Sequence, residues 1–177
     1  MRTVGFNSQR NNLKVNSLGA YSQCFTTANW ARMSYYCDAI KADDDAGLAD
    51  FLKQVETVMG PHIEAVPHPS LYFDVQQKCV TSLLNLMGVS GRDVFESAVT
   101  MDRLYKLLQF GPVTIGTNKL GGLSNGHIIL AVDRDTYNDP FGDANDNYKN
   151  TNGEGVTYKR EMIAPHFTGN VLYWSKK

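Results

Sequence analysis

The chain is poor in several features that define whole classes of protein. Its three cysteines, Cys24, Cys37 and Cys79, are odd in number and none has CxxC spacing, which argues against a disulfide scaffold and a cysteine zinc knuckle. A reducing compartment fits this cysteine usage best. Lys and Arg number 17 against 18 Asp and Glu, and they are scattered along the chain. No basic surface is therefore expected to bind nucleic acid.

Membrane and targeting signals are missing as well. No apolar run approaches the roughly 20 residues of a membrane span, and the opening MRTVGFNSQRNNLK lacks the apolar core of a secretory signal. We therefore expect synthesis in the cytoplasm without a signal peptide. The 177 residues are 42% hydrophobic, which is enough for one core, and no repeat or linker divides them. A single domain over residues 1–177, acting as a monomer, is expected.

The order of the apolar patterns predicts helices first and strands last. Helical spacing predicts helices that begin at or just after Cys24, within 43–60, from Leu71 to Met87, and within 100–111, where Thr100 can cap the first turn. The β-branched and aromatic content that follows predicts strands in PVTIGTN (112–118), HIILAVDRD (127–135), VTYKREM (156–162) and NVLYWS (170–175). This order is typical of an α+β fold, with an N-terminal helical part packed on a mostly antiparallel sheet.

A cysteine at the start of a helix is chemically distinctive. The amides of the helix N-terminus carry partial positive charge, which favours thiolate over thiol, and a nearby imidazole strengthens this effect. The resulting pair combines a nucleophile with an acid that can protonate a leaving amine, provided that a carboxylate or amide orients the imidazole. Cys24, His127 and Asp139 supply these groups at a helix start, a strand start and an Asp-Pro turn after the next strand.

These residues lie within a longer resemblance to a known family. The segments NSQRNN, QCFTTANWARMSYY, GPVTIG and GHIILAVDRDTYNDPFGD resemble the papain-like cysteine peptidases akin to those that process bacteriocin leader peptides, and more closely the stand-alone members of bacteria and phages. Gly-His followed by Asn-Asp-Pro-Phe-Gly is the most specific part, whereas Cys24 precedes Phe-Thr where the family usually has Cys-Gly-Pro. The resemblance implies a papain-like domain with a nucleophilic Cys24, a base at His127, an orienting Asp139 and an upstream oxyanion-hole glutamine.

Two glutamines can fill that last role. Gln9, in NSQRNN, matches the Gln-x-x-Asn of the family but lies well before Cys24, so the intervening loop must fold back. Gln23 is adjacent to the cysteine, where its side chain can point elsewhere. We favour Gln9, because an oxyanion donor must lie across the attacked carbonyl, beside the Cys24 amide.

Each of these residues also has an ordinary structural explanation. A lone buried cysteine is usually an inert small hydrophobe, which is what we expect of Cys37 and Cys79 and is the alternative for Cys24. The alternative for His127 is a hydrogen-bonded structural histidine, and for Asp139 an ordinary turn residue. The structural explanation is favoured for Cys37 and Cys79. It is disfavoured for Cys24, His127 and Asp139, because a helix start, a strand start and an Asp-Pro turn together agree with a catalytic arrangement.

No cofactor and no metal site is expected. The three remaining histidines have the spacing of no zinc motif: His62, His68 and His166. Asp143, Asn145, Asn147 and Glu154 have the spacing of calcium-loop ligands, but Tyr148 stands where that loop needs glycine. We therefore favour a polar loop with Asx turns over a calcium site.

The sequence predicts a cysteine peptidase or amidase that hydrolyses a peptide or amide bond by a Cys–His–Asp mechanism. The resemblance favours a phage or bacterial peptidoglycan hydrolase of the endolysin kind, released to the cell wall at lysis. Two alternatives stay open: cleavage of a leader peptide or another protein partner, and an inactive peptidase-like module that binds peptides. Loops 60–70 and 118–126 are expected to determine specificity, the second as a glycine-rich mobile flap.

Overall fold

The computed structural model describes residues 3–12, 23–59 and 69–176. Its helices are α1 (Cys24–Tyr36), α2 (Asp45–Met59), α3 (Pro69–Leu86), α4 (Met101–Leu107) and α5 (Arg160–Ile163), with 3-10 helices η1 (Gln9–Asn12), η4 (Leu120–Gly122) and η5 (Ala144–Asp146). Its strands are β1 (Arg92–Glu96), β2 (Val113–Asn118), β3 (Gly126–Ala131), β4 (Thr136–Asn138), β5 (Val156–Thr157) and β6 (Phe167–Ser175). None of the described helices is long and apolar enough to cross a membrane. The elements confirm the predicted α+β class.

The strands of the described residues form one antiparallel sheet in the order β1-β6-β2-β3-β4-β5. Strand β6, the last in sequence, therefore lies between β1 and β2. Strands β2 and β3 pair along their whole length, from Val113 opposite Ala131 to Asn118 opposite Gly126. Strand β4 then returns beside β3, with Tyr137 opposite Ala131 and Asn138 opposite Leu130, so the chain leaves β4 in the direction of the start of β3.

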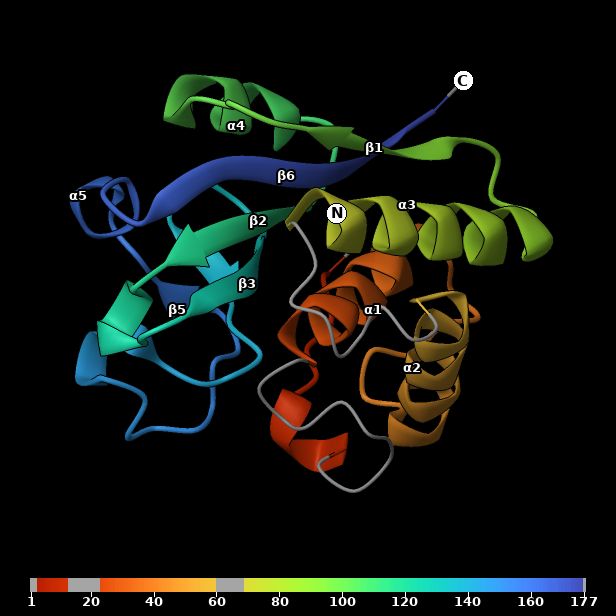
Figure 1. The fold of residues 1–177 in the computed structure, drawn as a ribbon, viewed down its shortest axis with the longest axis horizontal. Coiled ribbons are helices and arrows are strands. Elements are labelled where there is room, and N and C mark those ends of the chain that lie inside the picture. The colour runs from red at the N-terminus through yellow and green to blue at the C-terminus, as the bar shows by residue number, and fades with distance from the viewer. Residues whose placement is uncertain (1–2, 13–22, 60–68, 177) are drawn as a thin grey trace.

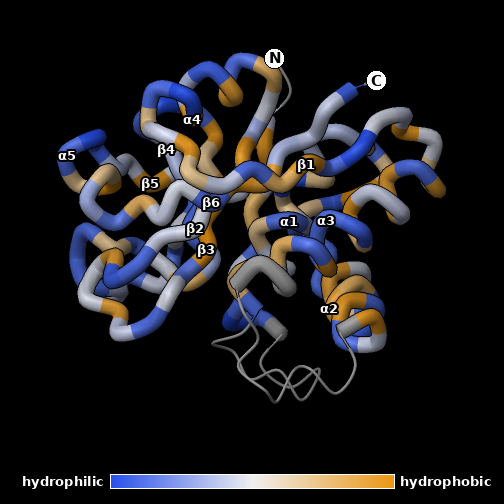
Figure 2. The backbone as a smooth tube through the Cα atoms, turned by 45° about the horizontal axis from the view of Figure 1, so that its top comes forward, coloured by the Kyte–Doolittle hydropathy of each residue, from blue (hydrophilic) through white to orange (hydrophobic). Residues whose placement is uncertain are grey.

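Side-chain alternation along the central strands gives the sheet two apolar faces. On one face, Val113 of β2 and Val171 of β6 join a core cluster that includes the buried side chains of α4. On the other face, Leu130 of β3 packs with Ala28 and Ala31 of α1. Helices α1 and α3 cover this second face, and α2 packs against both of them (Figure 1). Figure 2 shows hydrophobic positions gathered where these helices meet the sheet.

Helix α1 is the central helix of the molecule. Every residue from Cys24 to Met33 is buried, and Asn29 among them is hydrogen-bonded within the core. The Asn29 side chain donates to Gln76 of α3 at 2.9 Å and accepts from the Thr114 hydroxyl of β2 at 2.8 Å. Satisfied buried polar contacts of this kind fix the elements that they join. The start of α1 is therefore held in a defined position relative to the sheet.

The structure confirms one predicted helix cap and differs from the predicted elements in several places. Thr100 caps α4 as expected, since its hydroxyl accepts from the Arg103 amide at 3.2 Å. The stretch VTYKREM, predicted as one strand, forms only the two residues of β5 and then most of α5. Strand β1 was not predicted, and β6 begins at Phe167 rather than at residue 170. The predicted specificity loop 60–70 lies largely outside the described residues.

Candidate active site

Cys24 is the first residue of α1 and is 7% exposed. The preceding residue, Gln23, opens the helix through its backbone, because its carbonyl oxygen accepts from the Thr27 amide at 2.9 Å. The amides of the first helical turn thus lie at the thiol's end of the helix, where their partial positive charge favours a thiolate. The structure confirms the prediction that a helix begins at this cysteine.

His127 is the second residue of β3, and its side chain is 4% exposed. Its Nε2 atom lies 2.7 Å from Oδ1 of Asp139, whose side chain is fully buried. The β3–β4 hairpin produces this contact, because the antiparallel register carries the chain back along β3 before it turns at Asp139 and Pro140. The sequence prediction that the Asp139 carboxylate lies within hydrogen-bonding distance of a His127 nitrogen is confirmed.

The same imidazole also contacts the thiol. The Cys24 side chain is near enough to raise the pKa of His127, and Nδ1 is the ring nitrogen that does not face Asp139. Burial by itself lowers the pKa of His127, but the Asp139 carboxylate and the Cys24 side chain outweigh burial and raise this pKa to about 10. The ring is therefore protonated at neutral pH, which is the form that pairs with a thiolate.

Two tyrosines that the sequence prediction missed hold Asp139. Oδ2 of Asp139 accepts from the hydroxyl of Tyr158 at 3.0 Å and from that of Tyr148 at 3.3 Å. Oδ1 accepts from the Phe141 amide at 3.0 Å in addition to facing His127. Both tyrosines come after the Asp-Pro turn. The sequence pattern predicted a polar loop around Tyr148 and a strand around Tyr158. No spacing rule marks a tyrosine as a partner for a distant carboxylate.

Gln9 lies on the same side of the molecule as His127. Both residues line a pocket of about 390 Å³, together with Phe141 and residues 123–126. The other glutamine, Gln23, is fully buried beside Cys24. Gln9 thus lines the same pocket as His127 and is itself buried, at 1% exposed, and the choice between the two glutamines stays a prediction. Residues 123–126 belong to the loop that was expected to contact substrate.

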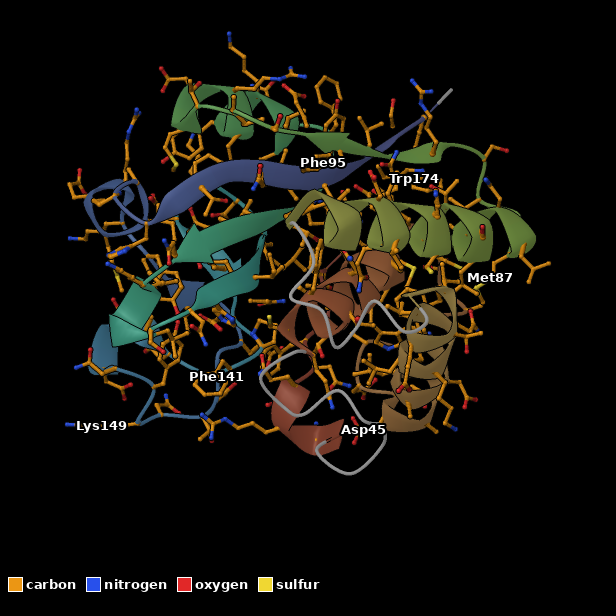
Figure 3. The ribbon with its side chains drawn as sticks, in the orientation of Figure 1. Asp45, Met87, Phe95, Phe141, Lys149 and Trp174 are labelled. Atoms are coloured by element: carbon orange, nitrogen blue, oxygen red, sulfur yellow. The ribbon has the colours of Figure 1, made fainter. Side chains whose placement is uncertain are left out.

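Backbone and side-chain contacts fasten the segment that carries Gln9 to the Asp-Pro turn. The Gln9 amide donates to the Pro140 carbonyl oxygen at 3.0 Å, and Nε of Arg10 donates to the Phe141 carbonyl oxygen at 3.0 Å. The Arg10 guanidinium also lies over the Phe141 ring, 4.3 Å from its centroid. Figure 3 shows Phe141 on one side of η1 and Asp45 on the other. The turn that positions Asp139 thus also positions Gln9.

Cys37, Cys79 and His166, the remaining cysteines and histidine that the structure describes, have other surroundings. Cys37 and Cys79 belong to the buried cluster between α1, α2 and α3, where structural thiols were expected. His166 is bonded through Nδ1 to a backbone carbonyl of β2 at 2.9 Å. His62 and His68 lie outside the described residues.

The loop 143–154 forms Asx turns. Asp143 accepts through Oδ1 from the amide of Asn145 at 2.9 Å. Asn150 and Asn152 likewise accept from the amides two residues further on, at 3.0 Å each. Within the described residues, no group of three or more His, Cys, Asp or Glu side chains is placed to hold a metal ion. The structure thus has the polar turns that we favoured over a calcium loop.

The fold has a counterpart among solved structures. The chain is similar to the crystal structure of a candidate C39-like peptidase from Bacillus anthracis, with a TM-score of 0.61 and 15% sequence identity over 100% of this chain and 96% of that chain. No protein-family model matches the sequence, and no curated protein matches it significantly. The structural similarity shows that the chain has the fold of a C39-like peptidase.

Proposed function

We propose that this protein is a cysteine peptidase or amidase in which Cys24 is the nucleophile, His127 the general acid and base, and Asp139 the group that orients the histidine. One observation carries the proposal: a buried imidazole contacts both the thiol at the start of α1 and a buried carboxylate. This arrangement meets the requirements of thiolate catalysis. The similarity in fold to a candidate C39-like peptidase supports the same reaction class.

In the proposed reaction, the Cys24 thiolate attacks the carbonyl carbon of the scissile bond and forms a carbon–sulfur bond. The Cys24 backbone amide and the Gln9 side-chain amide donate to the oxygen that becomes negative. The His127 imidazolium then protonates the leaving amine as the carbon–nitrogen bond breaks, which leaves a thioester. Neutral His127 takes a proton from water, whose oxygen attacks the thioester, and the acid product and the thiolate are released. Asp139 orients the imidazole and exchanges no proton with the substrate in these steps.

The substrate that we propose is the peptide part of peptidoglycan, cut by a phage or bacterial hydrolase that meets the wall when cells lyse. The resemblance of the sequence to stand-alone bacterial and phage peptidases supports this class. The pocket beside His127 is compatible with it, because the other lining residues carry no charge: Gln9, Leu123, Ser124, Asn125, Gly126 and Phe141. Cleavage of a leader peptide or another protein would use the same chemistry.

Selective alkylation tests the proposed nucleophile. Iodoacetamide at pH 6, followed by peptide-level mass spectrometry, should modify Cys24 at least about tenfold faster than glutathione, because an unperturbed thiol is almost wholly protonated at that pH. Cys79 serves as the control within the same molecule, since it is as buried as Cys24, at 8% against 7% exposed, and burial raises its pKa. A Cys24 that reacts no faster than glutathione would contradict the enzyme and favour a peptide-binding module.

Incubation with purified cell walls tests the proposed substrate. The protein should release fragments with new amino termini, identified by mass spectrometry, and Cys24→Ala should release none. If Cys24 is reactive but walls from several bacteria stay intact while an unstructured protein is cut, the substrate is a protein and the wall proposal is wrong.

A further inference from the structure

Protein donors fill the acceptor positions of the Asp139 carboxylate. An ionised carboxylate offers about four lone-pair sites, and four donors reach this one. His127 and the Phe141 amide take Oδ1, while the hydroxyls of Tyr148 and Tyr158 take Oδ2. The carboxylate is therefore fixed in both position and rotation, with one oxygen turned to the histidine.

The backbone of Tyr148 is strained in the conformation that delivers its hydroxyl. Tyr148 has a φ of 63° and follows Asn147 with a φ of 58°, and this left-handed region is an outlier for a bulky residue. Such strain persists only where the surroundings impose it, and it gathers at functional sites. Here the Tyr148 ring lies edge-on to His127, with centroids 6.0 Å apart and planes at 87°. The loop residue Gly121 leaves room for it, since a Cβ there would lie 2.6 Å from the ring.

The hydroxyl of Tyr158 is oriented by a second hydrogen bond. It accepts from the Ala144 amide at 2.9 Å, so its own proton is directed to Asp139 at 3.0 Å rather than to the more distant Gly142 carbonyl oxygen at 3.4 Å. The Tyr158 ring stacks on Tyr137, with centroids 5.4 Å apart. The two tyrosines thus approach the same carboxylate oxygen from separate segments, each held by its own contacts.

We propose that Tyr148 and Tyr158 are positioning residues for the reaction, which hold the Asp139 carboxylate through Oδ2 and keep its Oδ1 aimed at His127. This inference rests on the proposed function. Hydrogen bonds to the charged form of a carboxylate stabilise that form, and the two hydroxyls supply two such bonds to Oδ2. A stable anion on one side of the imidazole in turn stabilises the imidazolium that pairs with the Cys24 thiolate.

The titratable and charged groups around Asp139 are few. Those that contact it directly are His127, Tyr148 and Tyr158. Those one contact further away are Cys24 beyond the imidazole, Asp143 near Tyr148, and Arg10 over the Phe141 ring. Burial and the Asp139 charge raise the pKa of both tyrosine hydroxyls, so both remain protonated donors across the pH range of the test below.

The test compares three Tyr→Phe variants of the full chain. Tyr148→Phe and Tyr158→Phe each remove one donor from Asp139 and keep the ring. Tyr137→Phe is the matched control, because Tyr137 is fully buried and stacks on the same cluster while its hydroxyl donates to the Arg134 carbonyl oxygen at 3.2 Å. The measurement is the rate of Cys24 alkylation by iodoacetamide from pH 4 to pH 9, read by peptide mass spectrometry.

In the two test variants, the acidic limb of the plot of Cys24 alkylation rate against pH should shift to higher pH by about one unit. At a given pH on that limb, the rate should therefore be about tenfold lower. Tyr137→Phe should follow the wild type. Tyr158→Phe also removes the acceptor of the Ala144 amide, so its melting temperature should fall further than that of Tyr148→Phe, but packing loss alone does not move a pH profile.

Profiles of both test variants that coincide with Tyr137→Phe would overturn the inference and leave the proposed function standing. A wild-type Cys24 that reacts no faster than glutathione at pH 6 would instead overturn the proposed function, and the inference with it.

Discussion

Asp93 and Asp139 are both fully buried carboxylates, and their partners differ. Asp93 of β1 forms a bidentate ion pair with Arg32 of α1, with both nitrogen–oxygen distances at 2.7 Å. Asp139 faces His127, also at 2.7 Å. Helix α1 thus contributes to both places, with the buried arginine in its second half and Cys24 at its first residue.

The difference between Arg32 and His127 as partners makes the Asp93 contact a structural one and the Asp139 contact one that can take part in proton transfer. A guanidinium keeps its proton at any pH at which the protein is folded, whereas an imidazole can release and regain one. Burial raises the pKa of Asp93 even though the Arg32 charge opposes it, which shows how costly desolvation of this ion pair is. The Asp93 pair therefore links α1 to the sheet permanently, while the Asp139 pair is suited to a proton that moves.

The largest expected effect is on turnover, when the nucleophile is removed. Cys24→Ala should lower the rate of hydrolysis by at least about 10⁴-fold, because no other group can form the thioester. Cys79→Ala is the matched control: it should keep activity and lower the free energy of unfolding by about 1–2 kcal/mol, through packing alone. Turnover of a defined substrate and thermal melting measure both. A Cys24→Ala protein that still turns over would exclude this thiol as the nucleophile.

Asp139→Asn should lower turnover by about 10²- to 10³-fold, which is less than either Cys24→Ala or His127→Ala. An amide can still orient the imidazole, but it cannot stabilise the imidazolium by charge. Steady-state kinetics on the three variants measure the order. The roles that we propose would be reversed by an inactive Asp139→Asn beside a nearly wild-type His127→Ala.

The other buried carboxylate should affect stability alone. Asp93→Asn should lower the free energy of unfolding by about 3–5 kcal/mol, because it leaves the Arg32 charge buried without its counter-charge. The double variant Arg32→Met/Asp93→Leu should lose less, since it removes the desolvation cost together with the pair. Urea unfolding measures both, and Cys24 alkylation should stay at the wild-type rate. Slower alkylation in a folded Asp93→Asn protein would mean that the two regions are coupled.

The smallest expected effect is a change of stability with pH. The pKa of His127 is raised from 6.5 to about 10, so its protonated form contributes to the free energy of unfolding in full below pH 6.5, and this contribution is lost as the pH rises toward 10. The stability gap between wild type and His127→Ala should therefore narrow from pH 6 to pH 10 in urea titrations. The gap between wild type and Asp93→Asn should stay constant over the same range. A gap for His127→Ala that widens with pH would contradict the assigned charge.

The sequence was sufficient for the residues whose type and position agree with a local signal. Cys24 opens a helical pattern, His127 opens a strand, and an Asp-Pro turn follows the next strand. The contact between His127 and Asp139 could therefore be predicted from the hairpin that joins their strands. Tyr148 could not be found this way, because its contact with Asp139 depends on two consecutive left-handed residues. Among non-glycine residues, that conformation is selected by the surrounding packing rather than by the residues themselves.

The errors in the fold have a similar origin. The run VTYKREM has the β-branched and aromatic content of a strand, but the chain leaves the sheet after Thr157, and Tyr158 directs its hydroxyl to Asp139. Strand β1, RDVFE, is short and has charged residues at both ends, so its own β propensity is weak. It forms because β6 pairs with it from Arg92 to Glu96. Tertiary contacts thus overrode local preference in both places.

The position of β6 in the sheet constrains the order in which a growing chain can fold. This strand, Phe167–Ser175, lies between β1 and β2, so neither of them has its central neighbour until residue 175 has left the ribosome. The N-terminal segment also lacks its partners until late in synthesis. The Gly5 carbonyl oxygen accepts from the Asn138 side chain, and the Gln9 amide donates to the Pro140 carbonyl oxygen. Contacts so distant in sequence form slowly. A nascent chain therefore contains Cys24 long before it contains the strand that completes the centre of the sheet.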